Sequence, residues 1–163
     1  MTIETFDDLF LHTLKDVLYA ERKILKALPK MEKNATNAKL KLALTTHKDE
    51  TENHILRLEE VFDLLGKPAR GAKCDAMLGL LEEAEGLMSE IEDPETMDAA
   101  IISLAQAVEH YEIARYGTLV QWAKQLGHTK VAELLKETLD QEYATDKSLS
   151  KLAEKTVNAA ATA

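Results

Sequence analysis

Apolar residues recur at three- and four-residue spacing in long runs of this sequence, which is the period of one face of an α-helix. The first run predicts a helix from about Thr5 to Asn34, and Thr5 with Asp8 resembles a capping pair at its start. Pro29 lacks the amide hydrogen that a helix interior needs, so we expect a kink or a break there. The apolar stripe of this helix comprises Phe6, Phe10, Leu14, Val17, Ile24 and Leu28.

Turn residues place the next two helices. A polar turn at 34–37 precedes a second long helix, which we expect to end at Leu65 because Gly66 and Pro68 follow it. A shorter helix is predicted at about 74–92.

Cap residues place the last two helices. Asp93 and Pro94 predict the start of a third long helix, because Asp caps well and Pro fits the first turn. We expect this helix to continue to about Gln125 and to end at Gly127. Thr129 can cap the fourth long helix.

These elements predict an all-α fold made of two antiparallel helical hairpins. The helix at 74–92 has 19 residues and spans roughly 28 Å, enough to carry the chain back along the bundle between the hairpins. Such a crossover gives an up-down-down-up, ferritin-like four-helix bundle with one extra helix. We expect a single domain at 1–155 and a frayed tail at 156–163.

Charge and cysteine content narrow the classes of function. The formal net charge of −9 argues against binding to nucleic acids or to anionic membranes, which need clusters of Lys and Arg. Cys74 is the only cysteine among the 163 residues, so no internal disulfide can form. Neither a signal peptide nor a run of apolar residues long enough for a bilayer is recognisable. We therefore expect a cytoplasmic location.

Carboxylates interrupt the apolar stripes where leucines would be expected. They are Glu21 on the first helix, Glu109 and Glu112 on the third long helix, and Glu142 on the fourth. The second helix places His54 on its stripe, with Glu50 beside it. A carboxylate in a core costs several kcal/mol unless it is paired, protonated or bound to a metal.

Residue counting predicts that these side chains share one level of the bundle. Glu21 and Glu50 are 29 residues apart across the first hairpin turn, and Glu112 and Glu142 are 30 apart across the second. Antiparallel helices joined by short turns place residues that are equally far from the turn side by side. Asp146 lies as far from the second turn as Glu109 does.

Acidic and imidazole side chains at one level predict a site for two metal ions. Oxygen ligands with one or two imidazoles suit iron or manganese, and zinc less specifically. The expected metal ligands are Glu21, Glu50, His54, Glu109, Glu112, Glu142 and Asp146.

Each assignment has a plainer alternative. The glutamates could be boundary carboxylates paired with Arg or Lys, and Glu109 could be an acceptor that orients a histidine. We interpret His47 as a packed or supporting histidine rather than a ligand. Tyr116 either hydrogen-bonds a ligand or packs in the core, and Glu82 is expected to face solvent.

Three segments resemble the YciE/YciF-type bacterial stress proteins: HKDETENHILRLEEVF, KCDAMLGLLEE and, most distinctively, EHYEIARYGTL. The resemblance extends from about Asp7 to Ala153. It implies a ferritin-like, rubrerythrin-related bundle, a homodimer, a link to stress responses and a fold that could hold a dinuclear metal site. It does not supply a reaction, because the activity of the family is not settled.

The sequence departs from the usual di-iron pattern, which has Glu-x-x-His on two helices. Here Glu50 and His54 are four residues apart, and no histidine follows Glu142 on the fourth helix. There is also no Cys-x-x-Cys pair for an electron-transfer module, so a redox activity would need a separate electron donor.

Two functions of different classes follow. The leading hypothesis is a stress-associated protein whose dinuclear iron or manganese site acts on O₂, peroxide or ferrous iron. The alternative is a non-enzymatic bundle that dimerises or binds a partner, with at most a structural metal.

Overall fold

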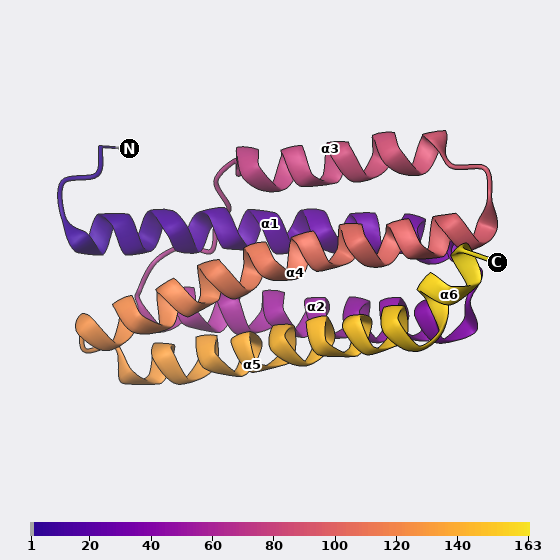
Figure 1. The fold of residues 1–163 in the computed structure, drawn as a ribbon. Helices are drawn as coiled ribbons and strands as arrows, with labels where there is room; N and C mark the ends of the chain where they lie inside the picture. The colour runs from indigo at the N-terminus through magenta and orange to yellow at the C-terminus, as the bar shows by residue number, and fades with distance from the viewer. Residues whose placement is uncertain (1) are drawn as a thin grey trace.

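The computed structural model describes residues 2–163, and its regular structure is entirely helical over that range. Four long helices form the bundle, and a fifth lies along the outside of it and connects the two hairpins (Figure 1). They are α1 (Phe6–Asn34), α2 (Ala38–Leu64), α3 (Asp75–Glu90), α4 (Pro94–Gln125) and α5 (Thr129–Leu152), of which α3 is the crossover. In Figure 1, α1 and α5 run in one direction while α2 and α4 run in the other. The predicted all-α, up-down-down-up bundle is therefore confirmed.

Local capping explains most helix boundaries. Thr5 and Asp8 form a reciprocal capping box at the start of α1, and the Asp93 carboxylate accepts a hydrogen bond from the amide of Thr96 at the start of α4. Gly66 and Gly127 adopt φ values of 64° and 78° just after α2 and α4. These left-handed conformations favour glycine and turn the chain out of each helix.

The expected cap of the fourth long helix and the expected break at Pro29 were wrong, whereas the kink that was the other expectation at Pro29 stays a prediction. The residue that caps α5 is His128, which makes no side-chain capping hydrogen bond, and Thr129 is the first helical residue. Helix α1 also runs unbroken through Pro29. Pro29 is exposed, so water can satisfy the carbonyl that the proline leaves without a partner.

The C-terminal tail is helical rather than frayed. A π-helical turn at Ala153–Val157 extends α5 and leads into the short helix α6 (Asn158–Ala161). Leu149, Ala153 and Val157 are buried and belong to the same apolar cluster as Ile101 and Ile102 of α4, which the π-helical turn contacts. Their four-residue spacing continues the α5 stripe, and this burial offsets the entropy cost of ordering the tail.

A buried aspartate fixes the α1–α2 turn to α4. The Asp98 carboxylate accepts hydrogen bonds from the Thr36 amide at 2.7 Å, the Thr36 hydroxyl at 2.6 Å and the Asn37 amide at 2.9 Å. The Asn37 side chain in turn caps α2. The first hairpin is thereby held in register with the second.

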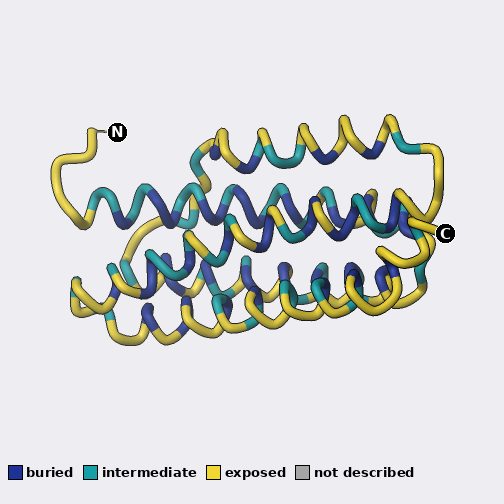
Figure 2. Tube along the Cα trace, viewed as in Figure 1, coloured by how far each residue is buried: buried dark blue, intermediate teal, exposed yellow. Residues whose placement is uncertain are grey.

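The apolar core is divided into two clusters along the bundle axis. One cluster lies toward the α1–α2 turn and includes Ile24, Leu44 and Val108. The other lies toward the α4–α5 turn and includes Leu18 and Leu58. Figure 2 shows buried positions along the inner sides of the long helices, whereas α3 is largely exposed. The residues between the two clusters are polar, and they form the candidate site.

Candidate metal centre

All four long helices contribute to a polar layer between the two apolar clusters. Its six members are 3% exposed or less and comprise Glu21 from α1, His47 and His54 from α2, Glu109 and Glu112 from α4, and Glu142 from α5. On each helix these residues continue the apolar stripe, so the same helical period that builds the core also points them inward.

Glu21, His54 and Glu142 form the first of two ligand groups. His54 Nδ1 lies 3.1 Å from Glu142 Oε1 and 3.4 Å from Glu21 Oε1. The hydroxyl of Tyr116 donates a hydrogen bond to Glu21 Oε1. Tyr116 thus holds the Glu21 carboxylate in place and leaves Oε2 without a hydrogen-bond partner.

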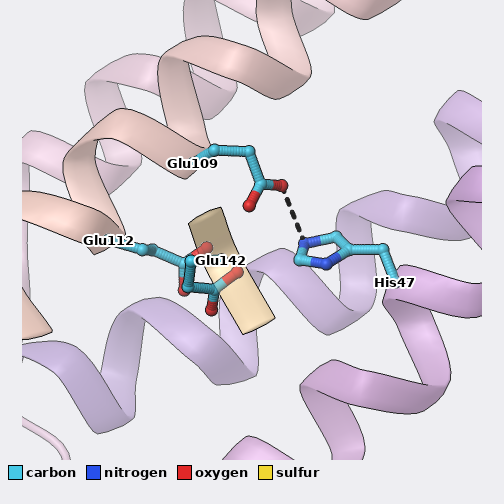
Figure 3. Close-up of side chains that lie close together, drawn as sticks. All are labelled: His47, Glu109, Glu112 and Glu142. Atoms are coloured by element: carbon cyan, nitrogen blue, oxygen red, sulfur yellow. Dashed lines mark ion pairs between the residues drawn. The ribbon is translucent and has the colours of Figure 1, made fainter. Parts of the chain in front are cut away.

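His47, Glu109, Glu112 and Glu142 form the second group (Figure 3). His47 Nε2 lies 3.1 Å from Glu109 Oε1, and the carboxylates of Glu112 and Glu142 lie beside each other. One ligand atom from each of the four residues lies within 4.8 Å of every other. Glu142 belongs to both groups, so its carboxylate is the one that both groups share.

The orientation of the His54 ring is set from outside the cluster. Its Nε2 lies 3.1 Å from Gln141 Oε1, which also accepts a hydrogen bond from an Arg57 guanidinium nitrogen. Because Arg57 can only donate, the oxygen of the Gln141 amide must face both partners, and His54 Nε2 must carry a proton. His54 Nδ1 is then directed at Glu21 and Glu142 as the ring's potential ligand atom.

Burial dominates the electrostatics of the second group. It raises the pKa of Glu109 and of Glu112 well above the ordinary value of 4.5, and the neighbouring carboxylates raise both pKa values further. Burial also lowers the pKa of His47 below 6.5. Burial therefore favours the uncharged form of these acids and of the imidazole when no cation is bound.

In the first group, the contacts between His54 and the carboxylates outweigh burial, so the pKa values of His54 and Glu142 shift toward the charged forms. Burial would lower the pKa of His54, but hydrogen bonding and charge from Glu142 and Glu21 raise it to about 10. Burial would raise the pKa of Glu142, but His54 holds it below its ordinary value. His54 is therefore a cation that lies between two carboxylates, with its Nδ1 directed at both.

The unsatisfied donors and acceptors of the chain are concentrated in this layer. Among residues 2–163, the buried side-chain nitrogen and oxygen atoms without a hydrogen-bond partner all belong to the six residues, apart from one oxygen of Asp16. Leaving such groups unpaired costs about 1–3 kcal/mol each. Six converging carboxylate and imidazole side chains with free lone pairs therefore fit a metal cluster better than a closed ion-pair network.

The structure places two of the expected ligands outside this layer. Glu50 is partly exposed, with its Oε2 4.0 Å from His47 Nδ1 and 3.3 Å from the Thr145 hydroxyl that donates to it. Burial raises the pKa of Glu50, whose carboxylate lies beside the layer, and its role as a ligand stays a prediction. Asp146 accepts a hydrogen bond from Gln106 at 2.8 Å and contacts His110 at 3.3 Å. Its short side chain ends at the rim of the site.

His47 is the residue that sequence reasoning missed. It is 3% exposed and belongs to the second ligand group. The signal was present, because His47, Thr51 and His54 follow the core spacing of α2. Counting levels from the turn favoured Glu50 instead. Glu82, expected to face solvent, is exposed and lies at a groove between α1 and α3.

Comparison with known proteins agrees with this fold and this register of helices. Residues 5–162 match a family described as a domain of unknown function, DUF892. The chain belongs to the DUF892 family. Among the described residues, no helix combines the length and apolar character that a bilayer span requires.

Two relatives of this DUF892 protein are similar over nearly their full lengths. YciF from Escherichia coli K12 is 45% identical over 159 residues, which are 97% of this chain and 96% of YciF. The crystal structure of that E. coli stress protein superimposes with a TM-score of 0.91 at 44% identity, covering 96% of this chain and 99% of the other. YcfI from Rhodopseudomonas palustris, described as a suspected structural protein, has a TM-score of 0.90 at 49% identity, covering 91% and 94%.

Proposed function

We propose that this protein is a stress-associated metalloprotein that holds two iron or manganese ions in the polar layer. The observation that carries the proposal is the concentration of buried, unpartnered carboxylate and imidazole atoms from all four long helices. The stress association is proposed from the similarity to YciF, which is named as a stress protein.

The charge of the layer supports two divalent ions. The four glutamates, Glu21, Glu109, Glu112 and Glu142, carry four negative charges when ionised, and two divalent cations carry four positive charges. The two histidines add imidazole ligands without adding charge when neutral. Mainly oxygen donors with some imidazole suit iron and manganese best, with zinc as a less specific occupant.

The chain assigns distinct tasks to the ligands. Glu142 is shared between the groups, and each group has one histidine of its own. Tyr116 is buried and its pKa is raised by burial, so it stays a phenol and keeps donating to Glu21. The apolar clusters on either side exclude water and strengthen the charge interactions within the layer. When bound, two such ions supply one-electron redox chemistry toward O₂, peroxide or ferrous iron.

Metal content per chain tests the proposal. Protein purified without a metal-binding tag should contain close to two equivalents of iron or manganese by mass spectrometry. Glu142→Gln should lose most of this metal, because it removes the carboxylate shared by both groups. Glu133→Gln, an exposed glutamate on the same helix, is the matched control and should keep it. Equal and substoichiometric metal in all three proteins would contradict the proposal.

A second candidate is a structural bundle without turnover. It is favoured by the cation–carboxylate contact of His54 with Glu21 and Glu142, which can hold the metal-free layer together with protons alone. The description of YcfI points the same way, although it concerns that protein. This reading predicts that the metal-free chain keeps its fold and that a metal-filled chain consumes neither peroxide nor ferrous iron.

A further inference from the structure

The crossover helix leaves a groove against α1. The groove has a volume of about 510 Å³, and its walls carry apolar side chains from both helices, including Ala27, Met31 and Leu81. Lys30 of α1 and Glu85 of α3 form an ion pair across its rim. The groove is open to solvent at the surface and apolar further in.

A second, much smaller cavity of about 10 Å³ lies deeper in the bundle. It shares Ala27, Met31 and Leu81 with the groove, so the two spaces are separated only by these side chains. At its inner end it is lined by His47 and Glu109, which belong to the second ligand group. A line of apolar contacts therefore connects solvent to the polar layer from the α3 side.

We propose that this line is the path by which dissolved O₂ reaches the metal centre, with Leu81 as its gate. The proposal rests on the proposed function and gives that site a substrate, O₂. It gives the crossover helix α3 a role in O₂ access, in addition to its role in connecting the two hairpins.

The apolar lining of the path favours a small apolar molecule over water, peroxide or a metal cation. A space of this size is about one water-sized sphere, and its wall between the groove and His47 is apolar. Water and peroxide need hydrogen-bond partners, which this wall lacks, and a metal cation would lose its hydration there without replacement. A small uncharged apolar gas makes no strong hydrogen bonds with water, so it loses none when it enters the path.

The position of Leu81 makes it the residue able to open and close the path. It is partly buried on α3, whose buried residues are only Met77, Ala84 and Met88. Few buried contacts allow a helix to shift at low cost. A rotamer change of Leu81, or a small movement of α3, would join the groove to the inner cavity.

Relaxation of methyl groups by dissolved O₂ tests the path in the metal-free full chain. The methyls of Ile24, Leu28 and Val108 line the inner cavity, and those of Leu14 and Leu58 lie in the other apolar cluster. In the wild type, we expect O₂ to enhance proton relaxation several-fold more in the first set than in the second.

Variants at the gate make the test decisive. Leu81→Phe fills the gap and should reduce the enhancement at Val108 several-fold, whereas Leu81→Ala should increase it. Leu87→Phe, at an exposed position on the same helix, is the matched control and should change nothing. Equal enhancement in both clusters, or no response to either Leu81 variant in folded protein, would overturn the path.

Failure of the path and failure of the metal site are distinguishable. Metal content of Leu81→Phe should equal that of the wild type, because Leu81 is not a ligand. An O₂ effect without metal binding would support the apolar route to the polar layer but overturn the proposed function, and with it the role of that route. Metal binding without an O₂ effect would support the proposed function and overturn the path.

Discussion

The orientation of His54 in the polar layer depends on Gln141, a residue outside that layer. Gln141 accepts a hydrogen bond from His54 Nε2, and Arg57 fixes which way the Gln141 amide faces. Partners of this kind hold the ring and its tautomer, and their loss typically lowers metal affinity about 10- to 100-fold.

Gln141→Leu should therefore weaken metal binding without removing a ligand. We expect an affinity loss of about 10- to 100-fold, measured by competition with a chromophoric chelator. Gln121→Leu, at an exposed position of α4, is the control and should bind like the wild type. An unchanged affinity in Gln141→Leu would show that His54 is not a ligand.

The pKa shifts of the layer predict how metal-free protein responds to alkali. Glu109 and Glu112 have raised pKa values, and that of His54 is raised to about 10, so the folded chain binds protons that the unfolded chain has released. The free energy of unfolding should then fall from about pH 7 to pH 10. His47 and Glu142 do not oppose this trend, because their lowered pKa values leave them equally deprotonated in both states there.

Urea unfolding at several pH values measures this slope. Glu112→Gln should flatten it by removing one of the titrating groups, and Glu133→Gln should leave it as steep as in the wild type. A slope that is identical in all three proteins would mean that surface charge, and not the buried layer, causes the pH dependence.

The sequence revealed the acids of the site because each one interrupts an apolar stripe. Glu21 and Glu142 stand where the period demands a core residue, which is an expensive place for a charge. His47 escaped this reasoning because a buried histidine is common and cheap when neutral. Glu50 was expected as a ligand because counting along a helix gives the height of a side chain but constrains its direction only loosely.

At the scale of the elements, Pro29 destabilises α1 because it removes one helical hydrogen bond. The proline leaves one carbonyl without its helical partner, and an alanine would restore the bond on an exposed face. Pro29→Ala should raise the free energy of unfolding by up to about 3 kcal/mol, measured in urea. A loss of stability would indicate that the proline shapes the helix end for packing.

The α1–α2 turn depends on one carboxylate from α4. Asp98→Ala removes the three hydrogen bonds that its buried carboxylate accepts from Thr36 and Asn37. We expect a destabilisation of about 3 kcal/mol by urea unfolding. Asp93→Ala, which removes only an exposed cap, is the comparison and should cost about 1 kcal/mol. Equal effects would mean that Asp98 acts only locally.

Helix boundaries were predictable where local chemistry sets them. Asp93 and Pro94 set the start of α4, and the glycines after α2 and α4 set the ends of those helices. These boundaries need little help from the rest of the fold. The tail was not predictable in this way, because a helix this short is marginal in water even when it is rich in alanine. It is ordered by burial of Val157 against α4, a contact between distant parts of the chain.

At the scale of the whole molecule, the bundle is two apolar cores separated by one polar layer. The four long helices are joined across that layer by its ligands, so bound metal would link both hairpins. Loss of metal should therefore loosen the centre of the molecule while each apolar cluster stays packed. The homodimer implied by the resemblance to YciE/YciF-type proteins stays a prediction.

Anomalous diffraction from crystals of the purified protein, at the iron and manganese absorption edges, tests the central claim most directly. The account predicts two anomalous peaks inside the layer, one contacted by His54 and Glu21, the other by His47 and Glu109, with Glu142 reaching both. Density for the same side chains with no anomalous peak, and with His54 hydrogen-bonded to Glu21 and Glu142, would contradict it.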